Sequence, residues 1–153
     1  MKAARRLGLH VLGVRRSGTP WRGVDEMVTP DRLAEVLPRA DFVVVNAPLT
    51  PETQGLVGRT ALSLMKPGAG LVNLARARVV DYEALAEKLR DGALSGAVLD
   101  VFDPEPLPAD SGLWSTPNLI ITPHVSSDDD ARHAPLTMDL VFDNIRRWRW
   151  GAG

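Results

Sequence analysis

The sequence has 153 residues, of which 44% are hydrophobic and 24% are charged, and its formal net charge at pH 7 is −1. This length and composition suit a single folded domain and exclude a disordered chain, and the interspersed charges indicate no nucleic-acid-binding surface. The absence of cysteine excludes disulfides, thiol catalysis and cysteine-ligated zinc. No apolar run approaches the roughly 18 residues of a membrane span, so we expect a soluble protein without membrane contact. We also expect a cytoplasmic location and no metal site.

The first residues predict the end of a helix followed by a strand. MKAARRL consists largely of helix formers, Gly8 suits a left-handed C-terminal cap, and LHVLGV predicts a buried strand near residues 9–14. A helix end that leads into a parallel strand normally follows an earlier strand and turn. The chain is therefore expected to open in the middle of a strand–helix unit.

Arg15 and Arg16 directly follow this strand. In a nucleotide-binding α/β fold, the end of the second strand meets the adenosine ribose, where an acidic residue accepts the 2′-hydroxyl of NAD and arginine suits the 2′-phosphate of NADP. The two arginines favour NADP. On the residues alone, a solvated basic turn is an equal alternative.

A turn-rich stretch over residues 18–29 leads to the next predicted helix, DRLAEVLPRA. Thr29 is expected to cap this helix, with Pro30 at its first position. The run DFVVVNAP then predicts a strand near residues 42–46, and its continuous apolar character is typical of a buried parallel strand. Residues 46–51 form a rigid loop that either only connects elements or forms a wall of a cofactor cleft.

The second half of the chain continues this alternation. A short helix is predicted over residues 56–65, and Asp81 is expected to cap a helix that stops at Gly92. The last segment, residues 128–150, predicts a long helix that is bent or restarted near Pro135. Further strands are predicted near residues 70–74, 96–100 and 119–122.

This alternation predicts an α/β fold with a doubly wound parallel sheet, and no internal repeat or linker divides the chain. The carboxyl ends of parallel strands lie along one rim of such a sheet, where ligands bind. The residues expected on this rim are Arg15, Ala47, Arg76, Asp100 and His124.

Arg76, Glu105 and His124 form a candidate catalytic set. Arginine holds a carboxylate with two parallel hydrogen bonds, and histidine exchanges a proton when a carbonyl becomes an alcohol. A carboxylate beside a histidine fixes its tautomer and raises its pKa. Together the three residues suit hydride transfer to a 2-keto acid. Simpler roles remain open for each: a surface ion pair for Arg76, which is easily confused with Arg78, a solvated loop for Glu105 and a half-buried structural histidine for His124.

Four segments occur in a characteristic order and spacing: NAPLTPETQGLVG, LVNLARARVVDYEAL, GAVLDVFDPEPLP and NLIITPHVSS. Together they resemble the D-isomer-specific 2-hydroxyacid dehydrogenase family, which includes glyoxylate/hydroxypyruvate reductases and phosphoglycerate dehydrogenases. The resemblance covers nearly the whole chain. It implies a Rossmann-like fold and an NAD(P)-dependent oxidoreductase that acts on a small 2-keto or 2-hydroxy acid, as a homodimer in the full-length form.

The resemblance also implies roles for individual residues. Arg76 would hold the substrate carboxylate, His124 would be the acid/base, and Glu105 would be its partner carboxylate. Arg15 falls where NAD-preferring members usually carry an acidic residue, and together with Arg16 it favours NADP over NAD. The other implied cofactor contacts are Asp100 on the nicotinamide carboxamide, Leu74 and Ala75 on the nicotinamide side, and Ala47, Pro48 and Thr53 along the cofactor cleft.

The chain departs from the family pattern in two respects. Ala77 replaces the glycine that usually follows the catalytic arginine, and the loop G-x-G-x-x-G does not occur in the sequence. We therefore expect residues 1–153 to be a partial dinucleotide-binding domain, with residues 128–153 leading back to an absent substrate domain. In the strand order 3-2-1-4-5-6, the absent first strand would leave a gap between strands 9–14 and 70–74, and the pyrophosphate would lose its backbone donors.

Two further interpretations remain open. One is a non-catalytic Rossmann-like module for interaction or dimerisation, and the other is an incomplete gene product whose missing part lies upstream. The terminal RRWRW suits a helix end whose arginines complement the helix dipole. Retention of Arg76, Glu105 and His124 favours descent from an active enzyme, while weak or no activity is expected of the chain alone.

Overall fold

The computed structural model describes residues 2–126 and residue 138. The chain divides into two compact units, Met1–Pro123 and His124–Gly153, and the fold given below is that of the first unit. The predicted helix over residues 128–150, including its interruption and its RRWRW end, lies outside the described residues apart from residue 138.

The first unit alternates short strands with short helices. Its strands are β1 (Leu12–Val14), β2 (Glu26–Val28), β3 (Phe42–Val45), β4 (Gly70–Asn73), β5 (Gly96–Leu99) and β6 (Leu119–Ile121). Its α-helices are α1 (Lys2–Arg6), α2 (Leu33–Val36), α3 (Arg59–Leu64) and α4 (Tyr82–Arg90), and its 3-10 helices are η1 (Pro30–Arg32), η2 (Leu37–Arg39) and η3 (Ala77–Val79).

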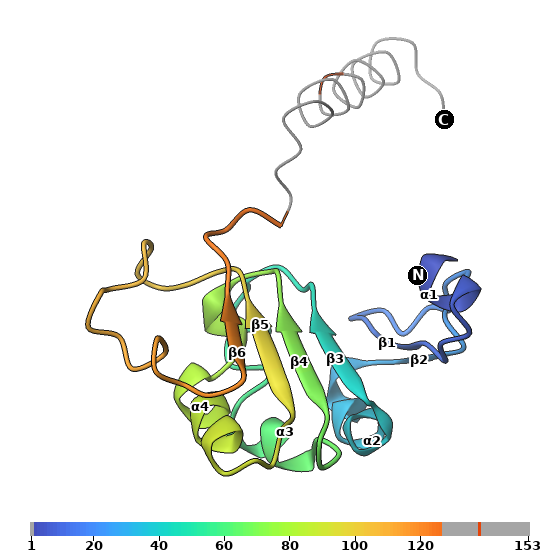
Figure 1. Ribbon diagram of the computed structural model, residues 1–153. Coiled ribbons are helices and arrows are strands. Elements are labelled where there is room, and N and C mark those ends of the chain that lie inside the picture. The colour runs from blue at the N-terminus through green and yellow to red at the C-terminus, as the bar shows by residue number, and fades with distance from the viewer. Residues whose placement is uncertain (1, 127–137, 139–153) are drawn as a thin grey trace. The chain divides into compact units, whose positions relative to one another are not determined.

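Four strands form a parallel sheet in the order β3-β4-β5-β6, and β1 and β2 form a separate parallel pair (Figure 1). Helix α3 lies between β3 and β4 in the chain, and α4 lies between β4 and β5. Parallel neighbours require such crossover connections. All five predicted strands are present within their predicted ranges, and the predicted Rossmann-like α/β class is confirmed.

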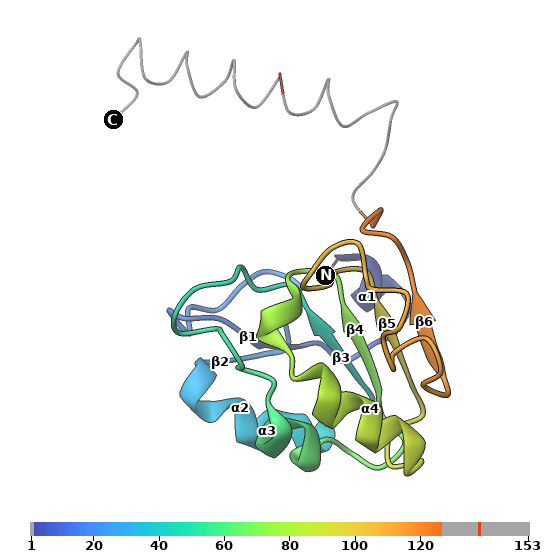
Figure 2. The ribbon, with the colours of Figure 1, turned by 90° about the vertical axis from the view of Figure 1, so that its left-hand side faces the viewer.

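The two faces of the four-stranded sheet differ. One face bears Leu71 and Leu99, which belong to the buried hydrophobic core together with residues of α3 and α4. Helices α2, α3 and α4 lie side by side (Figure 2). The opposite face exposes Phe42, Val44 and Ile120, whose exposed fractions are 71%, 61% and 60%.

Strand β2, Glu26–Val28, is not predicted by the sequence, which indicates a turn-rich stretch there. It pairs with β1 in parallel, so that Leu12 lies opposite Glu26 and Val14 lies opposite Val28. A three-residue strand is too short to give an apolar period of its own. Its pairing with β1, rather than its sequence, therefore defines it as a strand.

The strand order corrects the predicted position of the gap. The segments 9–14 and 70–74 do not pair, which agrees with a gap, but β4 pairs with β3 on one side and with β5 on the other. The strand at the open edge is therefore β3, and the prediction that named segment 70–74 is wrong. The reason is that the sequence did not predict β2. In the usual strand order 3-2-1-4-5-6, strand β2 of this structure takes the place of strand 3, so β3 takes the place of strand 4 and lies next to the gap.

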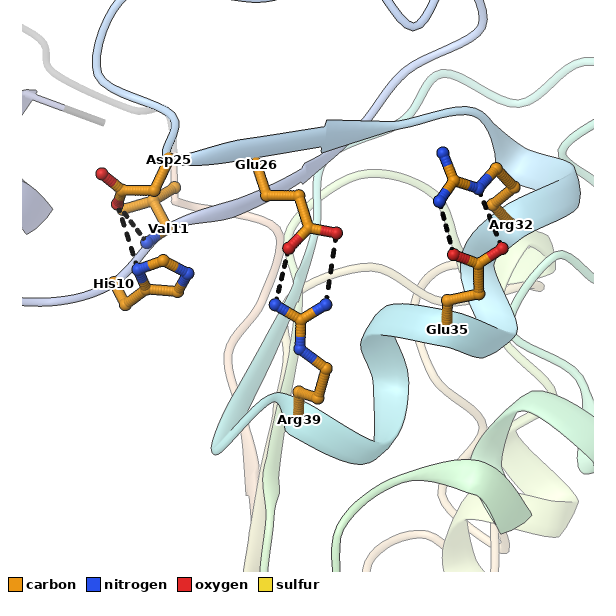
Figure 3. Close-up of polar contacts among 7 residues, drawn as sticks. All are labelled: His10, Val11, Asp25, Glu26, Arg32, Glu35 and Arg39. Atoms are coloured by element: carbon orange, nitrogen blue, oxygen red, sulfur yellow. Dashed lines mark hydrogen bonds and ion pairs between the residues drawn. The ribbon is translucent and has the colours of Figure 1, made fainter.

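Polar contacts tie the β1–β2 pair together and to the helix that follows it (Figure 3). Arg39 of η2 donates two hydrogen bonds to the carboxylate of Glu26, at 3.2 and 2.6 Å. Asp25 accepts a hydrogen bond from the backbone N–H of Val11 at 2.8 Å and lies 3.7 Å from Nδ1 of His10. The Arg39 and Glu26 side chains are 47% and 36% exposed, so their ion pair is expected to contribute little to stability.

The predicted helix ends are largely present. Asp81 caps α4 by accepting a hydrogen bond from a backbone N–H of the first turn at 3.0 Å, and Gly8 and Gly92 adopt left-handed φ angles of 76° and 69°. Pro30 opens η1 as predicted, but Thr29 makes no side-chain capping hydrogen bond to that helix. Across the described part of the chain, no helix is long and apolar enough to cross a membrane.

Candidate active site

The candidate site lies where the parallel strands of the first unit end (Figure 1). Three residues that follow the strands donate their backbone N–H groups to the neighbouring strand: Leu74 to Val45 at 3.3 Å, Asp100 to Asn73 at 3.1 Å, and Thr122 to Leu99 at 3.0 Å. The strands are therefore in register at their carboxyl ends. The carboxyl ends of β3 to β6 thus lie along one rim of this sheet, whereas Arg15 follows a strand of the separate β1–β2 pair and His124 belongs to the second unit.

Asn73, the last residue of β4, holds the turn that follows it. Its side chain is fully buried, its Oδ1 accepts a hydrogen bond from the backbone N–H of Ala75 at 3.1 Å, and its Nδ2 donates to the backbone carbonyl of Arg76 at 3.1 Å. Nδ2 also donates to Oη of Tyr82 at 2.8 Å, and Tyr82 in turn donates to the carbonyl of Val101 at 2.7 Å. One buried amide thus links β4, α4 and the segment after β5.

Arg76 and Arg78 are close in the sequence and either could be taken for the candidate site residue, but their partners in the structure differ. Arg78 forms an ion pair with Asp103. Arg76 is exposed, its Nη1 donates to the carbonyl of Ala75 at 2.6 Å, and it makes no ion pair with any of the described carboxylates. The guanidinium of Arg76 therefore keeps donors for an external carboxylate, and a two-pronged grip on such a group needs several donors in one plane.

Asp100 follows β5 and is fully buried. Its Oδ1 accepts a hydrogen bond from the hydroxyl of Thr122 at the end of β6. A buried carboxylate requires hydrogen-bond donors, because loss of its hydration is costly. At this rim it provides an acceptor of the kind that a carboxamide N–H₂ group requires.

Glu105 is exposed in the loop after β5, and its Oε1 accepts a hydrogen bond from the backbone N–H of Phe102 at 2.7 Å. The Phe102 ring packs edge-on against Tyr82, with ring centroids 6.2 Å apart. Burial raises the pKa of Tyr82, the hydrogen bond from Asn73 opposes this shift, and the negative charges of Glu105 and Asp100 add to it. Tyr82 therefore stays a neutral phenol and a hydrogen-bond donor in this network.

The loop after β3 contains the predicted cleft residues Ala47, Pro48 and Thr53. Thr53 holds this loop, because its hydroxyl donates to the carbonyl of Pro48 at 2.6 Å and accepts from the backbone N–H of Thr50 at 2.8 Å. Ala47 and Thr53 are half-buried, and Pro48 is exposed. The loop is thus internally fixed.

Arg15 and Arg16 lie in an exposed turn directly after β1. The backbone N–H of Gly18 donates to the carbonyl of Arg15 at 3.0 Å, and Gly18 has a left-handed φ of 61°. Of the remaining predicted residues, Ala75 is buried and Leu74 is 37% exposed.

His124 is exposed and has a left-handed φ of 57°, a conformation in which histidine is enriched among non-glycine residues. It is the first residue of the second unit, whereas Arg76 and Glu105 belong to the first. The pairing of His124 with Glu105 is therefore a prediction of the sequence alone.

Asn73 and Tyr82 are the residues of this rim that sequence reasoning misses. The signal available was a polar amide at the end of the otherwise apolar run GLVN, since a buried amide needs several partners. For Tyr82, the first residue of α4, the sequence offers no comparable signal, because its partners lie 9 and 19 residues away.

Known proteins share both the sequence and the fold of this chain. Residues 1–126 match the family described as D-isomer specific 2-hydroxyacid dehydrogenase, NAD binding domain. The (S)-sulfolactate dehydrogenase of Chromohalobacter salexigens is 39% identical over 150 residues, which make up 95% of this chain and 47% of that protein. The glyoxylate reductase of Thermococcus gammatolerans is 41% identical over 126 residues, or 82% of this chain and 37% of that protein.

A solved structure gives the same result for the fold. A D-isomer specific 2-hydroxyacid dehydrogenase from Xanthobacter autotrophicus, in complex with NADPH and MES, has a TM-score of 0.82 and 39% identity, and the match covers 97% of this chain and 60% of that one. The match covers less than half the length of these curated relatives, 47% of the sulfolactate dehydrogenase and 37% of the glyoxylate reductase.

Proposed function

The chain belongs to the D-isomer specific 2-hydroxyacid dehydrogenase family, and on this premise we propose that it is the cofactor-binding part of an oxidoreductase that transfers a hydride between NAD(P)H and a small 2-keto or 2-hydroxy acid. The observation that carries the proposal is the contrast between two neighbouring arginines. Arg78 is neutralised by Asp103, whereas Arg76 presents its guanidinium at the sheet rim without a carboxylate partner among the described residues.

In this proposal Arg76 binds the substrate carboxylate. Its guanidinium would place the 2-keto group next to the nicotinamide and polarise the carbonyl. The hydrogen bonds of Asn73 to Ala75 and Arg76 fix the backbone that carries this side chain. A shift of this turn would misplace the substrate, so Asn73 acts as its positioning residue.

His124 is the proposed acid/base, with Glu105 as its partner carboxylate. A protonated imidazole would give its proton to the carbonyl oxygen as that oxygen becomes an alcohol, and the carboxylate would hold the ring in the required tautomer. The support for this pair is the TPH and PEP segments, which match the family motif in order and spacing.

The cofactor, when bound, supplies the hydride. The residues present suit both ends of the cofactor. At the nicotinamide end, the buried carboxylate of Asp100 would accept from the carboxamide, and Leu74 and Ala75 would line the nicotinamide side. At the adenosine end, Arg15 and Arg16 offer cations for a 2′-phosphate. Ala47, Pro48 and Thr53 would line the cleft between these ends. We favour NADP over NAD on account of the two arginines.

The pyrophosphate in the middle of the cofactor has no equivalent donors in this sequence, because the loop G-x-G-x-x-G does not occur in it. We therefore propose that the chain alone, as a partial dinucleotide-binding domain, binds NADPH weakly and has little or no activity, and that the full-length form is a cytoplasmic homodimer. Micromolar binding in a titration followed by nicotinamide fluorescence would overturn the first part.

A second candidate function is a non-catalytic interaction or dimerisation module. It is favoured by the open sheet face, where Phe42, Val44 and Ile120 are each at least 60% exposed. Such an apolar patch on a sheet is typical of an interface. Sedimentation of the purified chain over a range of concentrations distinguishes a self-associating module from a monomer.

The test of the enzymatic proposal uses the chain as it exists. An isotope-labelled chain is titrated with oxamate, an unreactive analogue of a 2-keto acid, and the side-chain N–H signals of the arginines are followed by NMR. We expect the Arg76 signal to shift and the Arg78 signal to stay, and we expect Arg76→Lys to remove binding while Arg78→Lys retains it. Equal effects of the two substitutions would reject Arg76 as the carboxylate ligand.

A further inference from the structure

Trp21 has no role in the proposed reaction, yet it makes a specific contact with a residue that does. The guanidinium carbon of Arg15 lies 5.4 Å from the centroid of the Trp21 ring, within the distance of a cation–π interaction. The Trp21 side chain is 60% exposed. A tryptophan that stays in water adds little to the core, so its contact with Arg15 calls for another explanation.

The backbone fixes both partners of this contact. The N–H of Arg15 donates to the carbonyl of Val28 at 3.1 Å, which extends the β1–β2 ladder by one residue, and the carbonyl of Arg15 accepts from Gly18. The carbonyl of Trp21 accepts from the N–H of Val24 at 3.1 Å. Arg15 and Trp21 thus face each other from two anchored turns, and the long arginine side chain lies against a planar support.

Arg16 has a different environment. Its positive charge is one of the influences that hold the pKa of Glu52 below its usual value, after the hydrogen bond from Thr50, which is the largest. Neither Arg15 nor Arg16 forms an ion pair in the described ranges 2–126 and 138, so the contact that distinguishes Arg15 is its position over the Trp21 ring. The two arginines therefore differ in the support of their side chains, since Arg15 lies against an aromatic ring.

We propose that Trp21 is a positioning residue that holds the Arg15 guanidinium as the ligand of the 2′-phosphate of NADP. This inference rests on the proposed function, since it requires that the chain binds the adenosine end of a nicotinamide dinucleotide. Stacking on a ring leaves the edge of the guanidinium, which carries its N–H donors, available to a phosphate. A side chain that is already ordered loses less rotamer freedom on binding.

The experiment uses adenosine 2′-monophosphate as the probe and adenosine 5′-monophosphate as its matched control. The probe carries the phosphate of interest and does not need the pyrophosphate loop. Binding of both nucleotides to the full chain is measured by NMR titration, alongside inorganic phosphate. We expect the wild-type chain to prefer the 2′-nucleotide over both the 5′-nucleotide and inorganic phosphate.

The variants separate the roles of the residues. Trp21→Ala is expected to lower the affinity for the 2′-nucleotide roughly two- to fivefold, which corresponds to the loss of an exposed cation–π contact. The affinity for the 5′-nucleotide should not change. Trp21→Phe keeps a ring and should restore most of the preference. Arg15→Ala should abolish the preference, whereas Arg16→Ala should reduce it less, because the Trp21 ring supports Arg15. Trp114→Ala is the control, because Trp114 is another exposed tryptophan, whose Nε1 donates to Pro108 at 2.8 Å.

The side-chain N–H signal of Arg15 provides a second readout. Ring currents of Trp21 should displace this signal in the wild-type chain and in Trp21→Phe but not in Trp21→Ala, while a dispersed spectrum shows that each variant is folded. The inference is overturned if Trp21→Ala keeps the full preference or if Arg16→Ala costs as much as Arg15→Ala. A wild-type chain that binds both nucleotides equally also overturns it, and leaves the proposed dehydrogenase function intact with NAD as cofactor.

Discussion

Tyr82 gives the most direct test at the scale of single residues, because it is the only tyrosine of the chain. Burial raises its pKa, against the hydrogen bond from Asn73, so the folded protein favours the neutral phenol more than the unfolded chain does. The contribution of Tyr82 to stability is then fully present below its unfolded-state pKa of about 10 and is lost as pH rises through the higher folded-state value.

We expect tyrosinate absorbance to remain absent at pH 10 in the folded chain and to appear only at higher pH, together with loss of circular dichroism. The same chain in concentrated urea should titrate with a midpoint of about 10. A midpoint near 10 for the folded chain as well would show that Tyr82 is not buried in the hydrogen-bond network.

Asn73 is expected to be the most sensitive polar residue of the rim. Asn73→Ala removes the partners of the Ala75 N–H and the Arg76 carbonyl, and loss of buried hydrogen bonds of this kind costs about 1–3 kcal/mol. Asn46→Ala is the matched control, because Asn46 follows the neighbouring strand but is exposed. Urea unfolding measures both variants, and a loss for Asn46→Ala as large as that for Asn73→Ala would contradict the assigned role of Asn73.

At the scale of secondary structure, α4 has an acidic residue at each end with opposite expected effects. Asp81→Ala removes the N-terminal cap and should lower the free energy of unfolding by about 1 kcal/mol. Asp91 occupies the C-cap position, where its negative charge faces the negative end of the helix dipole. Asp91→Ala should therefore cost nothing or stabilise, as measured by thermal unfolding, and equal losses would argue against helix capping as the cause.

The elements also show how far the sequence predicts this fold. Strands β3 to β6 are apolar runs bounded by turn residues, so each is found within its predicted range. Strand β2 has three residues, and only its pairing with β1 makes it a strand. Because the sequence did not predict β2, the gap left by the absent strand was placed beside segment 70–74 instead of beside β3. The rim residues follow from the strand ends. The hydrogen bonds from Asn73 to Tyr82 and from Tyr82 to Val101 span 9 and 19 residues, and a local pattern does not contain them.

At the scale of the whole molecule, the sheet of the first unit carries a sequence suited to burial on both faces. The run FVVV of β3 is continuously apolar, as in a parallel strand covered on both sides. In the structure, however, burial differs between neighbouring residues of β3. Val45 is 6% exposed and belongs to the core, whereas Val44 is 61% exposed on the opposite face. An exposed apolar face on a parallel sheet with an unpaired edge at β3 is a surface that other chains can cover.

The pair Val44→Ala and Val45→Ala tests whether this face is open in solution. Both substitutions remove the same two methyl groups from adjacent positions of one strand, so differences in composition and strand propensity cancel. Val45→Ala should cost about 2 kcal/mol, since it removes buried apolar surface and leaves a cavity, whereas Val44→Ala should cost less than about 0.5 kcal/mol. Urea unfolding at low protein concentration measures both. If Val44→Ala costs as much as Val45→Ala, another part of the protein covers this face; if its cost grows with protein concentration, a second copy of the chain does so.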